Sequence, residues 1–544
     1  MTTPDELRTL IAGGEAISVE FKSDRGPLSD TELVEVATCL ANLQGGKILV
    51  GIEDDGQISG LHASRRSQPG ALAAFIASRT VPPLSVESEF IALPEGRIAV
   101  LTVPAARQPI ATSDGKLVMR FLDVHQKPGC RPLYPYELAS WKADRGQADM
   151  TAMPIMEATW DDLDALEFAR LRQMVEENRG DTVLLELPDD GIARALGLVT
   201  DDNGKLRPTQ AGLLLVGKEA ALRKYIPAHE IAFQVLKGSD IKVNEFRRWP
   251  LLRAQEWLMQ SIQVRNEEQE LMMGSLRIGV PRYDRRGIRE AVNNALIHRD
   301  YARLGAVHVQ LHDDHGLISN PGGFVLGVTP GNVLTASPHP RNPLLADAFK
   351  RIGLVERSGR GVGIIYFGQL QNGRRPPSYE RSTSSDVTIT LDARPANLDY
   401  VSFVVQTNRR RERPMQLPEL MAVWLAWQGG PVAIPDLSKY LQIEKAAVES
   451  LLADLSQAGL IQIQDQMYEL VDTGSKRSGD AQQIVLALIE QEGQVTRRSL
   501  IAALHIGEKQ AEYLLKTWVD KGFLQRIGKG RSVYYIRNPK INSE

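Results

Sequence analysis

The first 147 residues alternate between helical and strand periodicity. Apolar residues recur at helical spacing from 32 to 43, and Gly45 and Gly46 end that pattern. Short apolar runs over 47–52, 98–103 and 117–121 have the length and composition of strands. This mixture predicts one α+β domain over residues 1–147.

Residues 148–156 are polar and punctuated by Met and Pro, so we place a domain boundary there. Beyond it, residues 161–179 and 252–265 have amphipathic helical patterns, and the apolar run 212–215 predicts a buried strand. The simplest interpretation is one α/β region over residues 157–395 that begins with a helical lead-in.

The rest of the chain begins with a basic segment, residues 396–414, whose arginine-rich end predicts a linker. Residues 415–472 and 480–540 then each contain three helical stretches followed by a short β-rich end. In the second segment two strands flank Gly528-Lys529-Gly530, as a hairpin wing requires. This order predicts two consecutive winged helices.

Length and composition limit the class of protein. With 544 residues the chain is too long for one hydrophobic core, and 43% hydrophobic with 24% charged residues is typical of globular domains. The sequence has no apolar run of about 18 residues, and its start lacks the pattern of a signal peptide. We therefore expect a cytoplasmic protein with no membrane partner.

Charge and cysteine content narrow the class further. A net charge of −3 and a pI of about 6.4 exclude a histone-like protein, so contact with nucleic acid requires local basic patches. Cys39 and Cys130 are isolated, which predicts neither a disulfide framework nor a cysteine-based zinc site. We expect both to be inert, small hydrophobic side chains.

Three short motifs follow one another in the first domain. They are Glu15-x-x-x-x-Glu20-Phe21-Lys22, Ala41-Asn42-x-x-Gly45-Gly46 and Gly51-x-x-Asp54-x-Gly56. In this order the motifs resemble the Schlafen AlbA-type domain, and the resemblance covers residues 5–145. Some members of that family are metal-dependent RNA nucleases with a carboxylate trio, whereas others bind nucleic acid.

The resemblance implies a trio of Glu15, Glu20 and Asp54, with Glu53 or Asp55 as substitutes. Clustered carboxylates can hold Mg²⁺ or Mn²⁺ and activate water beside a phosphodiester. The alternative interpretation is that these acids are solvated residues of strand ends and turns.

Basic residues near the motifs are candidates for phosphate contacts: Lys22, Arg25 and Arg120, with Arg65, Arg66 and Lys127 as further members. Each of them also fits an ordinary solvated surface. In the resembling family the nucleic-acid groove is usually built from paired units. The single unit here therefore implies a homodimer or a higher homo-oligomer.

A second group of motifs lies in the central region. Glu290 and Asn294 are four residues apart in a helical pattern, which puts both side chains on one helical face. There Asn294 could ligate a metal ion and Glu290 could position water. This segment resembles the N-box of a divergent GHKL-type ATPase domain, whose fold is a Bergerat-like α/β sandwich.

Later segments continue that resemblance in family order: 318–324, 341–343 and 356–363. The resemblance implies ATP and Mg²⁺ as cofactors and Glu290 as the residue for hydrolysis. The cofactor-binding residues that it implies are Asn294, Asn320, Gly322, Gly323, Gly359, Gly361 and Gly363, because glycines let backbone amides approach phosphates.

Asn320 is a departure from the wider superfamily, which has an Asp that reads the adenine amino group. An amide donates as well as accepts hydrogen bonds, so base preference and hydrolysis stay open. His298, Arg299 and Asp300 follow the N-box. We interpret His298 and Asp300 as groups that brace the helix C-terminus, where cations suit the helix dipole.

The second winged-helix segment is locally basic. A recognition helix in the DNA major groove and a basic wing on the backbone would use Arg497, Arg498, Lys509, Lys529 and Arg531. The first segment carries Glu444, Glu449 and Asp454 around its third helix, which favours a protein-contact or spacer module. Dimerisation without DNA contact is the alternative for the whole tail.

The leading hypothesis is a multidomain α+β, ATP-responsive nucleic-acid-binding protein that acts as a DNA-binding transcriptional regulator. One alternative is a Schlafen-like metal-dependent nuclease acting on RNA or DNA, for example in phage defence. Another is a scaffold with a degenerate ATP fold, for which Asn320 and the acidic net charge are the indications.

Overall fold

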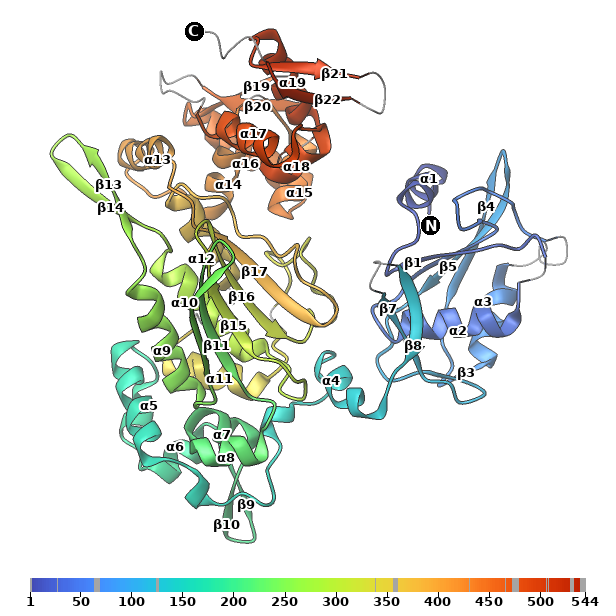
Figure 1. The fold of residues 1–544 in the computed structure, drawn as a ribbon. Coiled ribbons are helices and arrows are strands. Elements are labelled where there is room, and N and C mark those ends of the chain that lie inside the picture. The colour runs from blue at the N-terminus through green and yellow to red at the C-terminus, as the bar shows by residue number, and fades with distance from the viewer. Residues whose placement is uncertain are drawn as a thin grey trace.

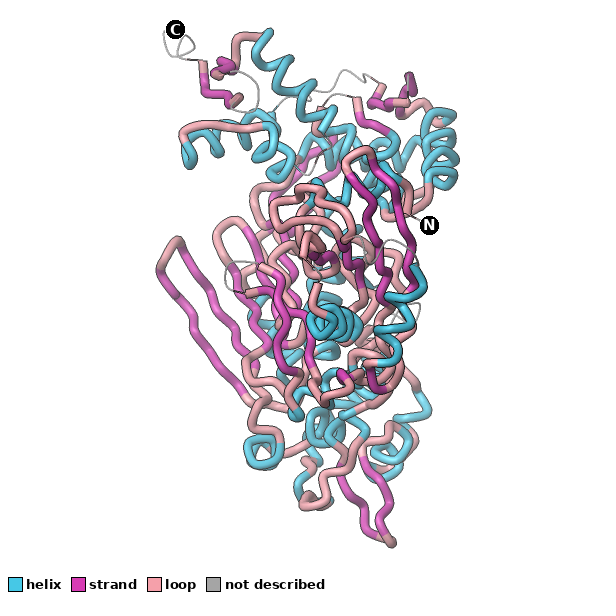
Figure 2. The backbone as a smooth tube through the Cα atoms, turned by 90° about the vertical axis from the view of Figure 1, so that its right-hand side faces the viewer, coloured by secondary structure: helices cyan, strands magenta, loops and turns pink. Residues whose placement is uncertain are grey.

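The computed structural model describes residues 2–26, 28–62, 69–123, 127–337, 339–355, 361–429, 431–464, 466–471, 479–504, 506, 508–528 and 533–538. The N-terminal domain lies to one side of the central region, and α4 (Leu138–Ala143) lies between them (Figure 1). Viewed from the side, the C-terminal helices form a separate layer at one end of the molecule (Figure 2). The protein is a multidomain α+β protein, as predicted.

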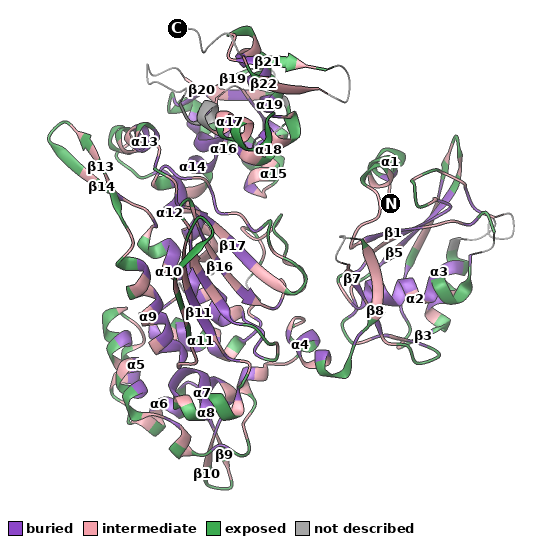
Figure 3. Ribbon diagram, in the orientation of Figure 1, coloured by how far each residue is buried: buried purple, intermediate pink, exposed green. Residues whose placement is uncertain are grey.

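The N-terminal domain is built on a four-stranded sheet of order β1-β2-β5-β4. β1 (Val19–Lys22) runs parallel to β2 (Gly46–Val50), whereas β5 (Gly96–Val103) and β4 (Glu87–Leu93) are antiparallel neighbours. The largely buried α2 (Asp30–Ala41) packs on one face of the sheet (Figure 3). On the other face, Leu7 of α1 (Pro4–Gly13) packs with Phe21 and Leu49.

Shorter elements complete this domain: α3 (Pro69–Ser78), β3 (Thr80–Val81), β6 (Ala111–Thr112), β7 (Val118–Leu122), β8 (Pro128–Pro132) and a 3₁₀ turn (Pro135–Glu137). The helix predicted over 32–43 is confirmed as α2. The strands predicted over 47–52, 98–103 and 117–121 are confirmed as β2, β5 and β7.

The expectation for the two cysteines is wrong, because Cys39 and Cys130 form a disulfide that joins α2 to β8. Their Cα atoms are 5.9 Å apart although 91 residues separate them in the chain. This distance is within the normal range for a disulfide.

The central region begins with a helical lead-in: 3₁₀ turns at Met150–Ala152, Trp160–Asp162 and Thr182–Leu185, α5 (Ala165–Glu177), α6 (Asp189–Ala195), β9 (Val199–Asp202), β10 (Lys205–Pro208), α7 (Gln210–Val216) and α8 (Glu219–Tyr225). The strand predicted over 212–215 is wrong, since these residues lie in α7. The Thr209 side chain caps this helix by accepting a hydrogen bond from the Gly212 amide at 3.1 Å.

A five-stranded sheet of order β12-β11-β15-β16-β17 forms the core of the central region. β11 (Ile231–Lys237) and β15 (Val307–Leu311) are parallel, whereas β12 (Asp240–Arg247), β16 (His315–Pro321) and β17 (Asp386–Asp392) are antiparallel to their neighbours. α9 (Leu251–Gln263), α10 (Arg285–His298) and α12 (Gly361–Gln371) share one hydrophobic core with this sheet. α11 (Pro343–Ile352) and the hairpin β13 (Glu268–Met273) with β14 (Leu276–Pro281) complete the region.

The segment predicted as a basic linker contains a helix, α13 (Leu398–Arg410). The Asn397 side chain caps it by accepting a hydrogen bond from the Tyr400 amide at 2.9 Å. Tyr400 then packs edge-on against Trp424 and Trp427 of α14 (Leu417–Trp427), with ring centroids 4.9 and 5.4 Å apart. These buried aromatic contacts join the segment to the first C-terminal unit.

Each C-terminal unit contains three helices and a hairpin. The first has α14 (Leu417–Trp427), β18 (Val432–Ala433), α15 (Ile434–Leu441), α16 (Lys445–Gln457), β19 (Ile461–Gln464) and β20 (Met467–Leu470). The second has α17 (Gly479–Glu492), α18 (Arg497–Leu504), α19 (Glu508–Asp520), β21 (Leu524–Ile527) and β22 (Tyr534–Arg537). The buried Gln510 of α19 donates hydrogen bonds to the Leu425 and Gly429 carbonyls at 3.0 and 2.8 Å, so the two units pack together.

No helix in the described part of the chain is both long and apolar enough to cross a membrane.

Candidate functional site

A cavity of about 480 Å³ lies between α10, β16, β17, α12 and the loop of residues 322–340, which we call the pocket loop. Most of its wall is apolar, including Ile318, Phe324, Val362 and Ile389. Polar groups enter from three sides: Glu290 and Asn294 from α10, Asn320 from β16 and Lys350 from α11. The size and the mainly apolar lining with a few polar groups are those of a small-molecule site.

Glu290 and Asn294 lie on the same wall of this cavity, on the helical face that their spacing predicted. Gly361 at the start of α12 lies directly against them. A Cβ atom at position 361 would come within 2.8 Å of Glu290 Oε2 and 3.6 Å of Asn294 Nδ2. A larger residue at position 361 would therefore displace the Glu290 carboxylate and touch Asn294.

The other predicted glycines are distributed differently. Gly323 lines the cavity, but Gly322 does not; it turns the chain at φ +97° beside Arg341 and Asp300. Gly363 does not line the cavity either, because it faces Leu417 of α14, whose Cδ2 would lie 3.4 Å from a Cβ atom there. The structure thus places neither Gly322 nor Gly363 against a ligand in the cavity. Gly359 lies outside the described residues.

The imidazole of His298 lines the cavity at the end of α10. Burial, together with the nearby Arg341 guanidinium, lowers the pKa of His298 to about 4. The ring is therefore neutral at neutral pH. The neighbouring Arg299 donates to the carbonyls of Asp300, Arg303 and Gly305 at 3.1, 3.2 and 2.7 Å, so it holds the loop that follows α10.

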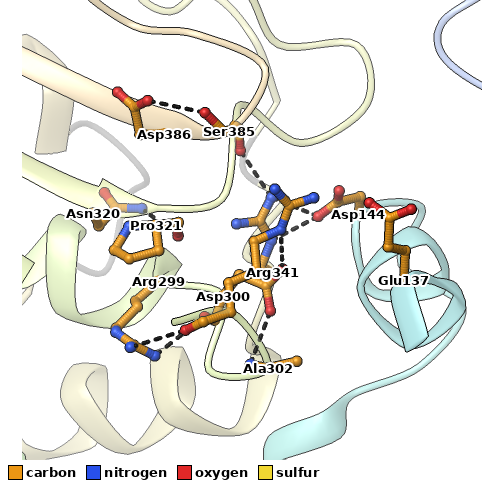
Figure 4. A network of polar contacts seen from close by, with 12 residues as sticks. Glu137, Asp144, Arg299, Asp300, Ala302, Asn320, Pro321, Arg341, Ser385 and Asp386 are labelled. Atoms are coloured by element: carbon orange, nitrogen blue, oxygen red, sulfur yellow. Dashed lines mark hydrogen bonds and ion pairs between the residues drawn. The ribbon is translucent and has the colours of Figure 1, made fainter. Parts of the chain in front are cut away.

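Arg341 connects the cavity wall to the segment that leads from the N-terminal domain (Figure 4). Its guanidinium forms an ion pair with Asp144 at 2.6 Å and donates to the carbonyls of His298 and Gly323 at 3.1 and 2.8 Å. The Asp144 carbonyl also accepts a hydrogen bond from the Leu326 amide at 3.1 Å. Asp144 thus holds the pocket loop through both its side chain and its backbone.

The residue after Asp144 holds the N-terminal domain. Arg145 stacks on Trp141, with its guanidinium carbon 3.6 Å from the ring centroid. It donates to the carbonyls of Leu43, Ala106 and Asn42 at 2.5, 2.9 and 3.0 Å. Burial lowers the pKa of Arg145 to about 10, so it stays charged at neutral pH. Two adjacent side chains therefore join the Ala-Asn-x-x-Gly-Gly motif to the pocket loop.

The pocket loop also contacts the first C-terminal unit. Gln442 ends α15 in the left-handed conformation, with φ 58°. Its side-chain oxygen accepts a hydrogen bond from the Leu334 amide at 2.9 Å, and its amide donates to the Pro330 carbonyl at 3.1 Å. This contact could not be predicted from the sequence, because more than a hundred residues separate the partners.

The predicted carboxylate trio of the N-terminal domain does not form a metal-binding cluster. Glu20 lies in ion pairs with Lys22 at 2.8 Å and with Arg120 at 2.5 Å. Glu15 accepts a hydrogen bond from the Phe21 amide at 3.0 Å, and burial raises the pKa of its carboxyl group. Asp54 is exposed. Within the described residues, no group of three His, Cys, Asp or Glu side chains is placed to hold a metal ion.

Three of the basic residues expected beside the trio form ion pairs, namely Lys22, Arg25 and Arg120. Lys127 is exposed, and Arg65 and Arg66 lie outside the described residues. Arg120 is only 2% exposed, and it also donates to the Ala16 and Val19 carbonyls at 3.1 and 3.3 Å, which leaves little of its side chain for the predicted phosphate contact. Lys22 has a second partner in Glu32 at 3.0 Å, and Arg25 lies 3.4 Å from Glu53. These cations stabilise the domain itself.

In the second C-terminal unit, Arg497 and Arg498 are exposed at the start of α18. Lys529 and Arg531 lie outside the described residues, as does the side chain of Lys509. On α19, Glu512, Tyr513 and Lys516 are exposed, so that surface of the helix carries charge of both signs.

Three regions of the chain match family models. Residues 15–127 match "Schlafen, AlbA_2", residues 305–391 match "Putative ATP-dependent DNA helicase recG C-terminal", and residues 140–232 match a domain of unknown function, DUF8451. A search of curated proteins gave no match.

Solved structures similar to this chain include the following two. One is the crystal structure of the DIP2311 protein from Corynebacterium diphtheriae, with a TM-score of 0.51 and 24% identity over 86% of this chain and 96% of that chain. The other is the mRNA-binding domain of elongation factor SelB from E. coli in complex with SECIS RNA, with a TM-score of 0.13 and 22% identity over 22% of this chain and 97% of that chain. The chain therefore carries a Schlafen AlbA_2 domain at its N-terminus, followed by a region of the recG C-terminal family.

Proposed function

We propose that this protein is an ATP-responsive nucleic-acid-binding protein that acts as a DNA-binding transcriptional regulator. In this proposal the five-stranded sheet with α9, α10 and α12 is a GHKL-like nucleotide domain. The two C-terminal units, each with three helices and a hairpin, are winged helices. Nucleotide in the cavity changes how the two ends of the chain bind nucleic acid.

The cavity supports nucleotide binding through its size and its arrangement of polar groups. A volume of about 480 Å³ is suited to a ligand of this class. The apolar wall and Asn320 would hold the base, and Lys350 supplies a positive charge for phosphate. Asn294 would hold Mg²⁺, which neutralises phosphate charge when bound, and Glu290 would position water.

The observation that carries the proposal is the pair of connections made by the pocket loop. On one side Asp144 binds Arg341 and the Leu326 amide, and Arg145 joins this point to the N-terminal domain. On the other side Gln442 binds both Pro330 and Leu334. A ligand that moves this loop would change contacts with both neighbours, and a continuous set of packed and hydrogen-bonded contacts can carry coupling between sites.

Support for nucleic acid as the partner comes from the two ends of the chain. The N-terminal region matches a family model whose resemblance implies nucleic-acid binding. The second C-terminal unit exposes Arg497 and Arg498 at the start of one helix. We rank the nuclease alternative second, because Glu20 already forms ion pairs with Lys22 and Arg120.

Nucleotide binding is tested by calorimetric titration and thermal unfolding of the full chain with Mg-ATP. A ligand at one hundred times its Kd stabilises the native state by about 2.7 kcal/mol. We expect a raised Tm for the wild type and a smaller rise for Asn294→Ala, which removes one proposed metal ligand. An unchanged Tm and no heat of binding in the wild type would contradict the proposal and favour the degenerate scaffold.

A further inference from the structure

Strand β12 is an unpaired edge of the five-stranded sheet. Among the described strands it pairs only with β11, and five of its eight residues are exposed. Two of these are large apolar side chains: Ile241 is 55% exposed and Phe246 is 41% exposed. A free strand edge offers unpaired backbone groups to another strand, and exposed apolar side chains favour such a contact.

A bulge determines which residues of β12 share a face. The register shifts between Val235 and Leu236 of β11, so Ile241 lies opposite Leu236 and Phe246 lies opposite Ala232. These two partners are four residues apart in β11, which puts Ile241 and Phe246 on the same face of the sheet. The Phe246 ring meets His308 of β15 edge-on, with centroids 6.3 Å apart, on that face.

The charged residues of β12 lie on the other face. Asp240 lies opposite Lys237, Glu245 opposite Phe233 and Arg247 opposite Ile231, all odd-numbered positions of β11. Within the strand, Lys242 pairs with Asp240 at 2.9 Å, and Arg247 pairs with Glu245 at 2.6 Å. In each half of the strand an acidic residue is therefore followed by a basic residue.

We propose that β12 pairs antiparallel with β12 of a second copy of this chain about a two-fold axis. That arrangement brings Asp240 to Arg247 of the other copy and Ile241 to Phe246, and it places Lys242, the extra residue of the bulge, beside Glu245. Each of these contacts occurs twice, as an isologous interface requires. When two copies of β12 run antiparallel, acidic residues therefore meet basic residues and apolar residues meet apolar residues.

Charged residues and bulges also occur on strand edges that stay unpaired, where they oppose association. Protection of that kind does not require acids and bases in a self-complementary order. It is also weakened by large exposed apolar side chains such as Ile241 and Phe246. The combination in β12 therefore favours pairing with a second copy.

Sedimentation velocity of the full chain over a concentration series tests the proposal with charge reversals. Lys242→Glu and Glu245→Lys each place like charges at two symmetric positions. We expect each to raise the dimer Kd by about tenfold or more. The double reversal Lys242→Glu with Glu245→Lys restores opposite charges and should recover most of the affinity. Lys205→Glu, an equal charge change on the exposed end of β10, is the matched control and should leave Kd unchanged.

Three results would overturn the proposal. The first is a wild-type protein that stays monomeric at all concentrations measured. The second is a dimer whose Kd is the same in the wild type and in both single reversals. The third is a double reversal that is no tighter than the single ones. None of these results depends on nucleotide binding, so failure of the dimer proposal would not contradict the proposed function.

Discussion

Removal of the Glu20 carboxylate should unfold the N-terminal domain at a lower temperature, whatever its effect on nucleic acid. In the folded domain the side chain of Glu20 is 9% exposed and that of its partner Arg120 is 1% exposed. Glu20→Ala leaves the Arg120 guanidinium buried, with the Ala16 and Val19 carbonyls as its remaining acceptors among the described residues. Lys22 loses the same partner but keeps Glu32.

The expected cost follows from that burial. Breaking a buried ion pair by removing one partner destabilises a protein by about 3–5 kcal/mol. For a domain of roughly 150 residues, each kcal/mol lowers Tm by about 2–4 °C, which gives a decrease of about 10 °C. The pair Glu20→Ala with Arg120→Met removes both charges and should recover much of this loss.

Differential scanning calorimetry of the wild type and the two variants measures this directly. A Tm for Glu20→Ala within about 1 °C of the wild type would refute a structural role for the ion pair, on the scale given above. The same samples distinguish the nuclease hypothesis. RNA cleavage that depends on Mg²⁺ and disappears in a Glu20→Ala variant of unchanged stability would make Glu20 a catalytic residue instead.

Three further expectations concern other parts of the chain. Gly361→Ala should weaken Mg-ATP binding by about tenfold or more in calorimetric titration, because its Cβ atom meets Glu290, whereas the matched Gly363→Ala should not; equal affinities would contradict this. Replacement of Arg497 and Arg498 by Glu should weaken DNA binding in anisotropy titrations. The slope of log K against log salt concentration should fall by the equivalent of roughly two phosphate contacts, and an unchanged slope would exclude α18 as a DNA-contacting helix. Burial lowers the pKa of His229 from its ordinary 6.5 to about 4. As the pH falls below 6.5, the imidazole is therefore protonated in the unfolded chain while it is still neutral in the folded protein. Stability present above pH 6.5 should be lost as the pH falls toward 4, and denaturant titrations of a His229→Gln variant should show less of this loss.

The periodicity of apolar residues was sufficient to predict strands of the N-terminal sheet, but it could not distinguish a helix from a strand in short apolar runs. Residues 212–215 form part of α7 because Thr209 caps a helix there, and a run of four apolar residues fits a strand equally well. The helical face of Glu290 and Asn294 followed from their spacing alone, since four residues are about one turn.

Long-range pairings could not be predicted from one sequence. Cys39 and Cys130 are 91 residues apart, and only the packing of α2 against β8 brings them together. Arg120 reads as a surface cation, and its burial depends on three acceptors that arrive from other segments. Gln442 has no distinguishing sequence context, because its role comes from a left-handed helix end that meets the pocket loop.

The coupling of the cavity to nucleic-acid binding is tested most directly by fluorescence anisotropy with labelled duplex DNA and single-stranded RNA, at one salt concentration, with and without Mg-ATP. We predict that ATP changes the nucleic-acid Kd of the wild type by about 5–150-fold. Gln442→Ala should bind ATP normally but lose most of that change, whereas Gln457→Ala, an exposed residue of the same unit, should retain it. An identical nucleic-acid Kd with and without ATP in a wild-type protein that binds ATP would contradict the proposed coupling.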